Sequence, residues 1–168
     1  MTQSGIVTYK KTNIHIVAPV EELDFFDTQF VSLSKEIRTI EAWRMIASNP
    51  PRMLKLAFLL RDKVSAFFGV QRINGFSGGC PDQVQVKDQL DFFVVEYISD
   101  TVLTLTVRDK HLDVMTCITT DHERLTITSS VKTHNAFGRV YMIPVAPAHR
   151  LIVSKDLKRV KQEIGKFL

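Results

Sequence analysis

The most regular pattern in the sequence is a row of apolar residues near the C-terminus. Its members lie three or four positions apart and are Val153, Leu157, Val160 and Ile164. This spacing predicts a helix with one apolar face, because residues three and four apart lie on the same side of a helix. Continued toward the N-terminus, the same face includes His149, so one histidine is expected to point at the core.

The predicted helix runs from Asn135 to Ile164 and contains two prolines. Asn135 suits the N-cap position, because its side chain can accept a hydrogen bond from a free N–H group of the first turn. Pro144 and Pro147 cannot donate backbone hydrogen bonds, so we expect a bend or a break between them. The C-terminal helix is therefore predicted to be long and proline-bent.

From Asp91 to Thr133 the apolar residues recur instead at every second position, which indicates β-strands. Polar turns near Ser99, Asp109 and Asp121 divide this region into four strands. Strands joined by such short turns form an antiparallel meander. The alternation predicts that one face of the sheet is covered by helices and that the other meets water.

The upstream half supplies the first sheet strand and two helices. An extended segment at Asp27 to Leu33 precedes a helix at Ile40 to Ala47, and Pro50 and Pro51 begin a second helix that ends near Gly69. The order predicts an α+β fold. In it, a curved antiparallel sheet carries the long C-terminal helix, and two shorter helices follow the first strand.

Composition and charge are those of one globular domain. The chain has 168 residues, of which 45% are hydrophobic and 24% charged. Its net charge of +4 is concentrated in residues 150–168, which hold six Lys or Arg and two Asp or Glu. The outer face of the last helix is therefore basic and can attract an anionic surface, although such faces are commonly only solvated. No aromatic residues are interleaved with these charges, so no nucleic-acid partner is expected.

Targeting and redox features point to the cytoplasm. Met1 to Gly5 lack the apolar core of a signal peptide. The densest apolar run, Leu56 to Leu60, is too short to span a membrane. Cys80 and Cys117 form no disulfide framework. We therefore expect a cytoplasmic protein with reduced thiols and no membrane span.

The sequence lacks the spacings that metals and cofactors require. No HExxH pattern or Cys and His pairing occurs among His111, His122, His134 and His149, so no metal is expected. The glycines near Gly75 precede no GK[ST] motif, which excludes a nucleotide loop, and no GxSxG elbow is present. Acid–base chemistry remains, with His149 as a proton carrier and Tyr141 or Tyr97 as a donor.

Three groups of residues carry a family resemblance. They are Leu60, Arg61, Asp62, Phe68 and Gly69; Asp109, His111, Leu112 and Asp113; and His134, Asn135, Gly138, Arg139, Tyr141, Met142, Pro147 and His149. Over about residues 27–160 the chain resembles a bacterial domain-of-unknown-function family, family 2867. That family is similar to the START and birch-pollen-allergen superfamily, also called the polyketide cyclase or SRPBCC superfamily.

The resemblance implies a helix-grip fold, in which a curved sheet wraps around the last helix. It leaves residues 1–26 as an N-terminal extension and makes residues 27–168 a single START-like domain. Members of the superfamily bind lipids, sterols, hormones or polyketides, and some catalyse cyclisation or dehydration. The implied site is a cavity between the sheet and the C-terminal helix, with no activity carried over residue by residue.

Side chains with polar groups that can face such a cavity are the candidate ligand-binding residues. They are Trp43, Tyr97, Thr116, Ser129, Thr133, Tyr141 and His149. Each also has a structural interpretation, with Trp43 in the core and His149 at a core or helix-end position. Phe92, Phe93 and Met115 can themselves fill the cavity, which would leave no ligand function.

Three functions stay open. The first is noncatalytic binding of a small apolar or amphipathic molecule. The second is a cyclase, dehydratase or isomerase-like enzyme in the same cavity. The third is an interaction module that uses the basic face of the last helix on an acidic partner.

Overall fold

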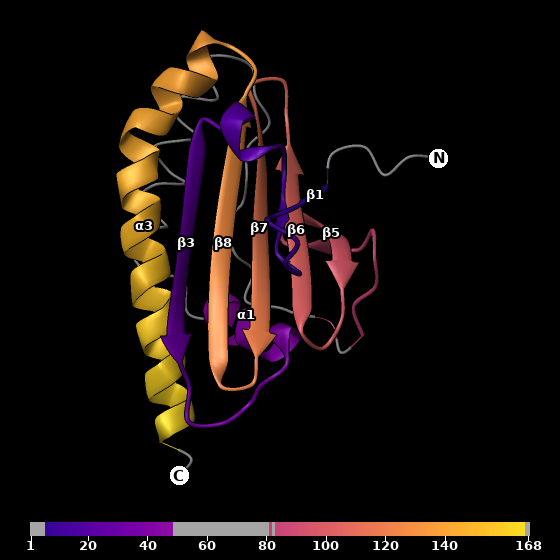
Figure 1. Ribbon diagram of the computed structural model, residues 1–168, viewed down its shortest axis with the longest axis vertical. Helices are drawn as coiled ribbons and strands as arrows, with labels where there is room; N and C mark the ends of the chain where they lie inside the picture. The colour runs from indigo at the N-terminus through magenta and orange to yellow at the C-terminus, as the bar shows by residue number, and fades with distance from the viewer. Residues whose placement is uncertain (1–5, 49–80, 82, 167–168) are drawn as a thin grey trace.

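The computed structural model describes residues 6–48, 81 and 83–166, and it shows an α+β fold built on a curved six-stranded antiparallel sheet (Figure 1). The strand order is β3-β8-β7-β6-β5-β4. The strands are β3 (Phe25–Ser32), β4 (Gln89–Leu90), β5 (Phe93–Ile98), β6 (Val102–Arg108), β7 (Leu112–Asp121) and β8 (Arg124–Thr133). The predicted meander of four strands is therefore confirmed as β5 to β8, and β3 closes the sheet beside β8.

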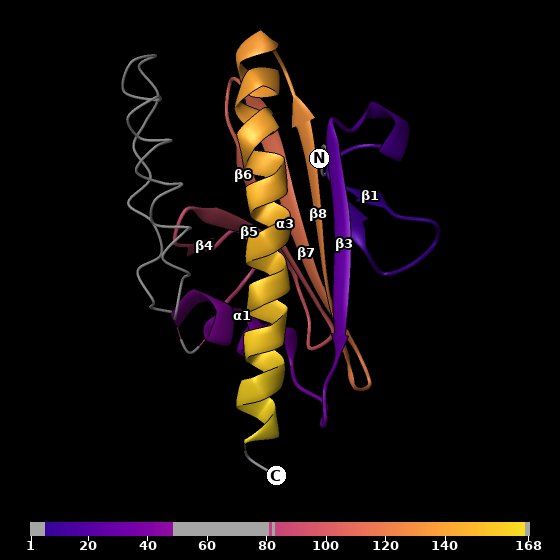
Figure 2. The same cartoon turned by 90° about the vertical axis from the view of Figure 1, so that its left-hand side faces the viewer.

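Two α-helices occur among the described residues, α1 (Thr39–Ser48) and α3 (Ala136–Gly165). A short 3-10 turn, η1 (Val20–Glu22), precedes β3. Figure 2 shows α1 on one side of the sheet and the two-stranded sheet of β1 (Val7–Thr8) and β2 (His15–Ile16) on the other. The second helix expected between Pro50 and Gly69 lies outside the described residues.

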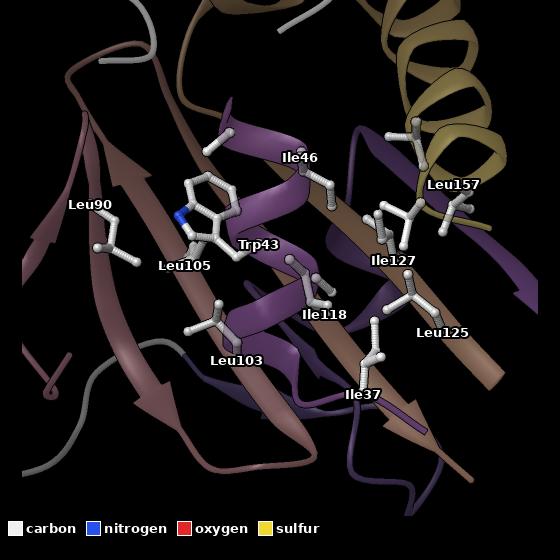
Figure 3. Packing of buried hydrophobic residues seen from close by; sticks show 14 of the residues in the cluster. Ile37, Trp43, Ile46, Leu90, Leu103, Leu105, Ile118, Leu125, Ile127 and Leu157 are labelled. Atoms are coloured by element: carbon white, nitrogen blue, oxygen red, sulfur yellow. The ribbon is translucent and has the colours of Figure 1, made fainter. Parts of the chain in front are cut away.

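The sheet face toward the helices, called the inner face, carries the main core. Its fully buried residues alternate along the strands as predicted and include Leu103, Leu105, Ile118, Leu125 and Ile127. Trp43 and Ile46 of α1 project toward this face (Figure 3). The row predicted on the last helix, from Val153 to Ile164, is buried in the same cluster.

The corner between β8 and α3 is fixed by Asn135, which is confirmed as the N-cap. Its Oδ1 accepts a hydrogen bond of 3.1 Å from the Gly138 N–H, and its Nδ2 donates one of 3.0 Å to the Lys110 carbonyl. The His134 N–H donates to the His111 carbonyl at 2.8 Å. These bonds hold the start of the helix against the turn before β7.

The two prolines do not break α3, which is continuous from Ala136 to Gly165. Pro144 and Pro147 remove the N–H partners of the Val140 and Ile143 carbonyls. Both prolines and both of these residues are exposed, so water can bond to the freed carbonyls. The expected break is therefore absent because the lost hydrogen bonds lie on the solvent side.

The outer face of the sheet, which was predicted to meet water, is covered in part. The Val17 N–H donates a 3.0 Å hydrogen bond to Ser130 Oγ, and the His15 N–H donates to Cys117 Sγ at 3.3 Å. Val17 and Ala18 pack with Met115, which is fully buried. Part of the predicted N-terminal extension thus shields polar and apolar side chains of β6, β7 and β8.

This cover predicts that Cys117 is chemically protected. Burial raises the pKa of its thiol, so little reactive thiolate forms. In a Cys80→Ser background we expect a thiol reagent to label Cys117 at least about 100-fold more slowly than a free cysteine. Val17→Asp should accelerate labelling and Val20→Asp, at an exposed position, should not. Labelling of the Cys80→Ser protein at the rate of free cysteine would show that this segment does not cover Cys117.

Candidate functional site

A polar row crosses three neighbouring strands of the inner face. In the strand register, Asp27 of β3 lies opposite Ser129 of β8, and Ser129 lies opposite Thr116 of β7. On one side of the row lies the cluster that contains Ile127 and Ile118, and on the other side lies the cluster of Phe25, Leu112, Val131 and Met142. The polar row therefore divides the apolar inner face into two parts.

Helix α3 brings His149 against the β3 end of this row. The His149 ring meets the ring of Phe25 edge-on, with 5.7 Å between centroids. The neighbouring Arg150 places its Nε 3.4 Å from Asp27 Oδ1. Gln29 Nε2 donates hydrogen bonds to Asp27 Oδ2 at 2.7 Å and to the Arg150 carbonyl at 3.0 Å. These contacts fix the helix to the edge strand at the height of His149.

Three buried polar atoms on β8 and α3 have no hydrogen-bond partner among the residues that the structure describes. They are Ser129 Oγ, Thr133 Oγ1 and His149 Nε2. A buried polar group without a partner costs about 1–3 kcal/mol. Ser129 carries this cost at 2% exposure. A bound molecule with a hydrogen-bonding group would remove the cost.

His149 is neutral near pH 7. Burial lowers its pKa below the usual 6.5, the Asp27 carboxylate opposes this effect, and the Arg150 guanidinium adds to it. A neutral imidazole has one nitrogen that donates and one that accepts. His149 can therefore accept a proton or a hydrogen bond from a bound molecule.

Thr133 and Tyr141 lie farther along, near the start of α3. Tyr141 packs against the cluster of Phe25, Leu112, Val131 and Met142. Gly138, in the first turn of the helix, faces the Cβ of Thr133. These two candidates therefore share the inner side with Ser129 and His149 but belong to the end of the sheet near the β8–α3 corner.

Trp43 and Tyr97 are separated from the polar row. Trp43 is 3% exposed in the core, where its ring meets Phe93 edge-on at 5.6 Å. Tyr97 lies on the outer face, 43% exposed, with its ring 5.2 Å from that of His15. A bulge between Val95 and Tyr97 adds one residue to β5, and one extra residue reverses which face the following side chain takes.

Sequence reasoning missed Asp27, Gln29 and Arg150 as members of this site. Each face of β3 carries two apolar residues, Phe25 and Val31 on the face of Asp27 and Phe26 and Phe30 on the other, so the alternation does not decide which face is inward. The structure places Phe26 and Phe30 on the outer face, where Phe30 is 61% exposed. No local signal in β3 identifies Asp27 as inward-facing, because its partners come from β8 and α3.

A second charged pair, Asp156 and Arg159, serves packing between helices. Asp156 Oδ1 lies 3.1 Å from Arg159 Nη2 without the alignment of a hydrogen bond. The same Nη2 donates to the carbonyls of Met45 and Ile46 at the end of α1, at 3.3 and 3.2 Å. This pair therefore joins α3 to α1 rather than contributing to the polar row.

Within the described residues, no group of three or more His, Cys, Asp or Glu side chains is arranged to hold a metal ion. In that same part of the chain, no helix has the length and apolar character needed to cross a bilayer.

A family model described as a protein of unknown function, DUF2867, matches residues 19–156. The chain belongs to this family. The matched DUF2867 segment contains the whole polar row and His149, and it begins before β3, within the segment predicted as an extension. No curated protein and no solved structure matched the chain.

Proposed function

We propose that this DUF2867 chain binds a small apolar or amphipathic molecule between the inner face of the sheet and α3. The observation that carries the proposal is the pair of unpartnered buried atoms, Ser129 Oγ and His149 Nε2, at a polar row flanked by apolar clusters. Binding sites for small molecules are mostly apolar with a few placed polar groups, and this arrangement has that character.

The arrangement of elements supports kinship with the helix-grip proteins of the START and SRPBCC superfamily. Those proteins bind ligands between a curved antiparallel sheet and a long C-terminal helix. This chain has both elements, and the apolar row of α3 packs onto the inner face. The proposed ligand position is therefore the one that the superfamily uses.

The charges around the row favour a neutral polar group on the ligand. The nearby cation, Arg150, is already paired with Asp27, and His149 is neutral near pH 7. The groups left to bind are a hydroxyl and a neutral imidazole. A ligand hydroxyl or carbonyl fits these partners better than a carboxylate or phosphate, which would lie close to the Asp27 charge.

Two adjacent serines allow a matched test. Ser129 and Ser130 are both buried, but Ser129 faces inward without a partner, whereas Ser130 accepts the Val17 N–H on the outer face. We expect Ser129→Ala to keep or slightly raise the free energy of unfolding and Ser130→Ala to lower it by about 1–2 kcal/mol. Urea unfolding of both variants measures these changes.

Ligand binding should show the reverse pattern: Ser129→Ala should lose binding and Ser130→Ala should keep it. In thermal-shift assays, sterols or neutral aromatic polyketides should stabilise the parent protein and Ser130→Ala but not Ser129→Ala, whereas fatty acids, which carry a carboxylate, should stabilise none of the three. A compound that stabilises all three proteins equally would contradict a role for the polar row. Loss of binding in Ser130→Ala alone would place the site on the outer face.

A second candidate, a cyclase, dehydratase or isomerase-like enzyme, is favoured by the neutral imidazole of His149 beside the Asp27 carboxylate. Among the described contacts, no hydrogen bond joins His149 to Asp27 or Ser129, so a nucleophilic triad is not assembled and acid–base chemistry is the remaining option. His149→Ala should then hold the ligand unconverted while the parent protein converts it. Mass spectrometry of the released molecule distinguishes the two outcomes.

A further inference from the structure

The side of α3 that points away from the sheet carries an apolar stripe, although it faces solvent. Val140 is 64% exposed, Ile143 72% and Leu151 56%. Pro144 and Pro147 are also exposed and lie between them at helical spacing. These five residues, the outward stripe, occupy one side of the first half of the helix.

The same side becomes basic in the second half of the helix. Lys155, Lys158, Lys161 and Lys166 are all exposed there, and Arg139 is exposed beside the outward stripe. None of these five has an ion-pair partner among the described residues. The carboxylates of α3 do not offset them, because Asp156 is buried and Glu163 is only partly exposed. The outward side of α3 is therefore apolar along one half and cationic along the other.

Helix α3 forms an outer edge of the molecule. In Figure 1 it runs along one side of the sheet beyond β3, and in Figure 2, which looks at that side, no other element lies in front of it. At 1.5 Å per residue, its 30 residues extend over about 45 Å. No other described element covers this ridge, which leaves it open to a large, flat partner.

We propose that the outward side of α3 docks on the surface of a membrane that contains anionic lipids. The outward stripe would enter the boundary between headgroups and acyl chains, and the lysines of the second half would lie among anionic headgroups. Long lysine side chains can keep their charge at the headgroups while their stems cover apolar surface. Docking on a membrane is independent of the molecule bound on the inner face.

The shape of the surface favours a bilayer over an acidic protein. A protein that binds a helix usually encloses it in a groove of its own, which needs access to the flanks of the helix, whereas α3 is packed against β3 and β8 and is open only on its outward side. Nucleic acid would use the lysines but has no need of the aliphatic stripe. The aromatic side chains in the described part of α3, Phe137 and Tyr141, are half-buried, and Phe137 packs against His111, so they form no exposed surface for base stacking. A surface that takes both cations and aliphatic side chains is an anionic bilayer.

The test is cosedimentation of the full chain with phosphatidylcholine vesicles, prepared with and without phosphatidylserine. We expect binding only to the vesicles with phosphatidylserine, and weaker binding as salt is added. Lys155→Glu/Lys158→Glu/Lys161→Glu should reduce the partition coefficient at least about tenfold, because each lysine contributes to the attraction. Ile143→Ser/Leu151→Ser should also reduce it about tenfold or more, because the serines remove inserted apolar area.

Two control proteins separate this surface from general charge and hydrophobicity. Lys10→Glu/Lys11→Glu/Lys87→Glu makes the same change in net charge at exposed positions away from α3, and Val94→Ser removes an exposed aliphatic residue from β5. Both should bind like the parent protein. Circular dichroism and thermal unfolding confirm that each variant is folded before binding is compared.

The proposal is overturned if the parent protein does not sediment with anionic vesicles, or if the α3 variants bind as the controls do. Binding to polyglutamate or to duplex DNA with no binding to vesicles would also overturn it and would assign the lysines to a polyanionic partner. Loss of binding in the lysine variant alone would reject insertion of the outward stripe.

Discussion

Replacing Gly138 with alanine is expected to lower the free energy of unfolding by about 3 kcal/mol, because the added carbon overpacks the β8–α3 corner. A Cβ on Gly138 would collide with the backbone carbonyl of His111 and lie 3.2 Å from Thr133 Cβ. The His111 carbonyl cannot move freely, since it accepts the His134 N–H at 2.8 Å. Chemical unfolding in urea measures the loss.

Gly165, near the other end of the same helix, is the matched control. A Cβ there meets no atom within 4 Å. Gly165→Ala should therefore raise the stability by up to about 1 kcal/mol, as alanine favours the helical backbone. If the two substitutions changed the stability equally, Gly138 would not be held against the β6–β7 turn.

Replacing Asp156 with asparagine is expected to stabilise the protein by about 3 kcal/mol near pH 7 and by little near pH 4. Burial raises the pKa of Asp156 from 3.8 to about 6, against the opposing effect of Arg159. The folded state therefore holds the proton more tightly than the unfolded chain. The parent protein loses this stability as the pH rises from about 4 through about 6, whereas asparagine stays neutral throughout.

The measurement is the difference in unfolding free energy between the two proteins, taken at several pH values across that range. In this difference, the contributions of the titrating groups that both proteins share cancel. If the difference in unfolding free energy did not change with pH, burial would not raise the pKa of the Asp156 carboxyl. A large loss of stability in the variant would instead make the ion pair with Arg159 the dominant effect.

The periodic elements were predictable because their pattern is local. The row from Val153 to Ile164 and the alternation along β6 to β8 reflect which residues can be buried together. Asn135 was identifiable as a cap because its side chain bonds within the first turn. The inward position of His149 followed from the same helical spacing, and its ring contact with Phe25 agrees with it.

The parts that were not predicted depend on contacts between distant segments. The orientation of Tyr97 depends on a one-residue bulge in β5, which leaves the composition of the strand unchanged. The role of Asp27 depends on Gln29 and Arg150, and the cover of the outer face depends on bonds from residues 15–17 to β7 and β8. The sequence predicted one long helix but left open a bend or a break at its prolines, and the absence of a break depends on their exposure, which only packing decides.

The most direct test of ligand binding on the inner face is native mass spectrometry of gently purified protein, compared with its mass after denaturation. We expect the parent protein and Ser130→Ala to retain a small molecule and Ser129→Ala to be empty. The mass of the retained molecule would also give its chemical class. A parent protein with identical native and denatured masses, and with no thermal shift across the panel of fatty acids, sterols and polyketides, would contradict the proposed function.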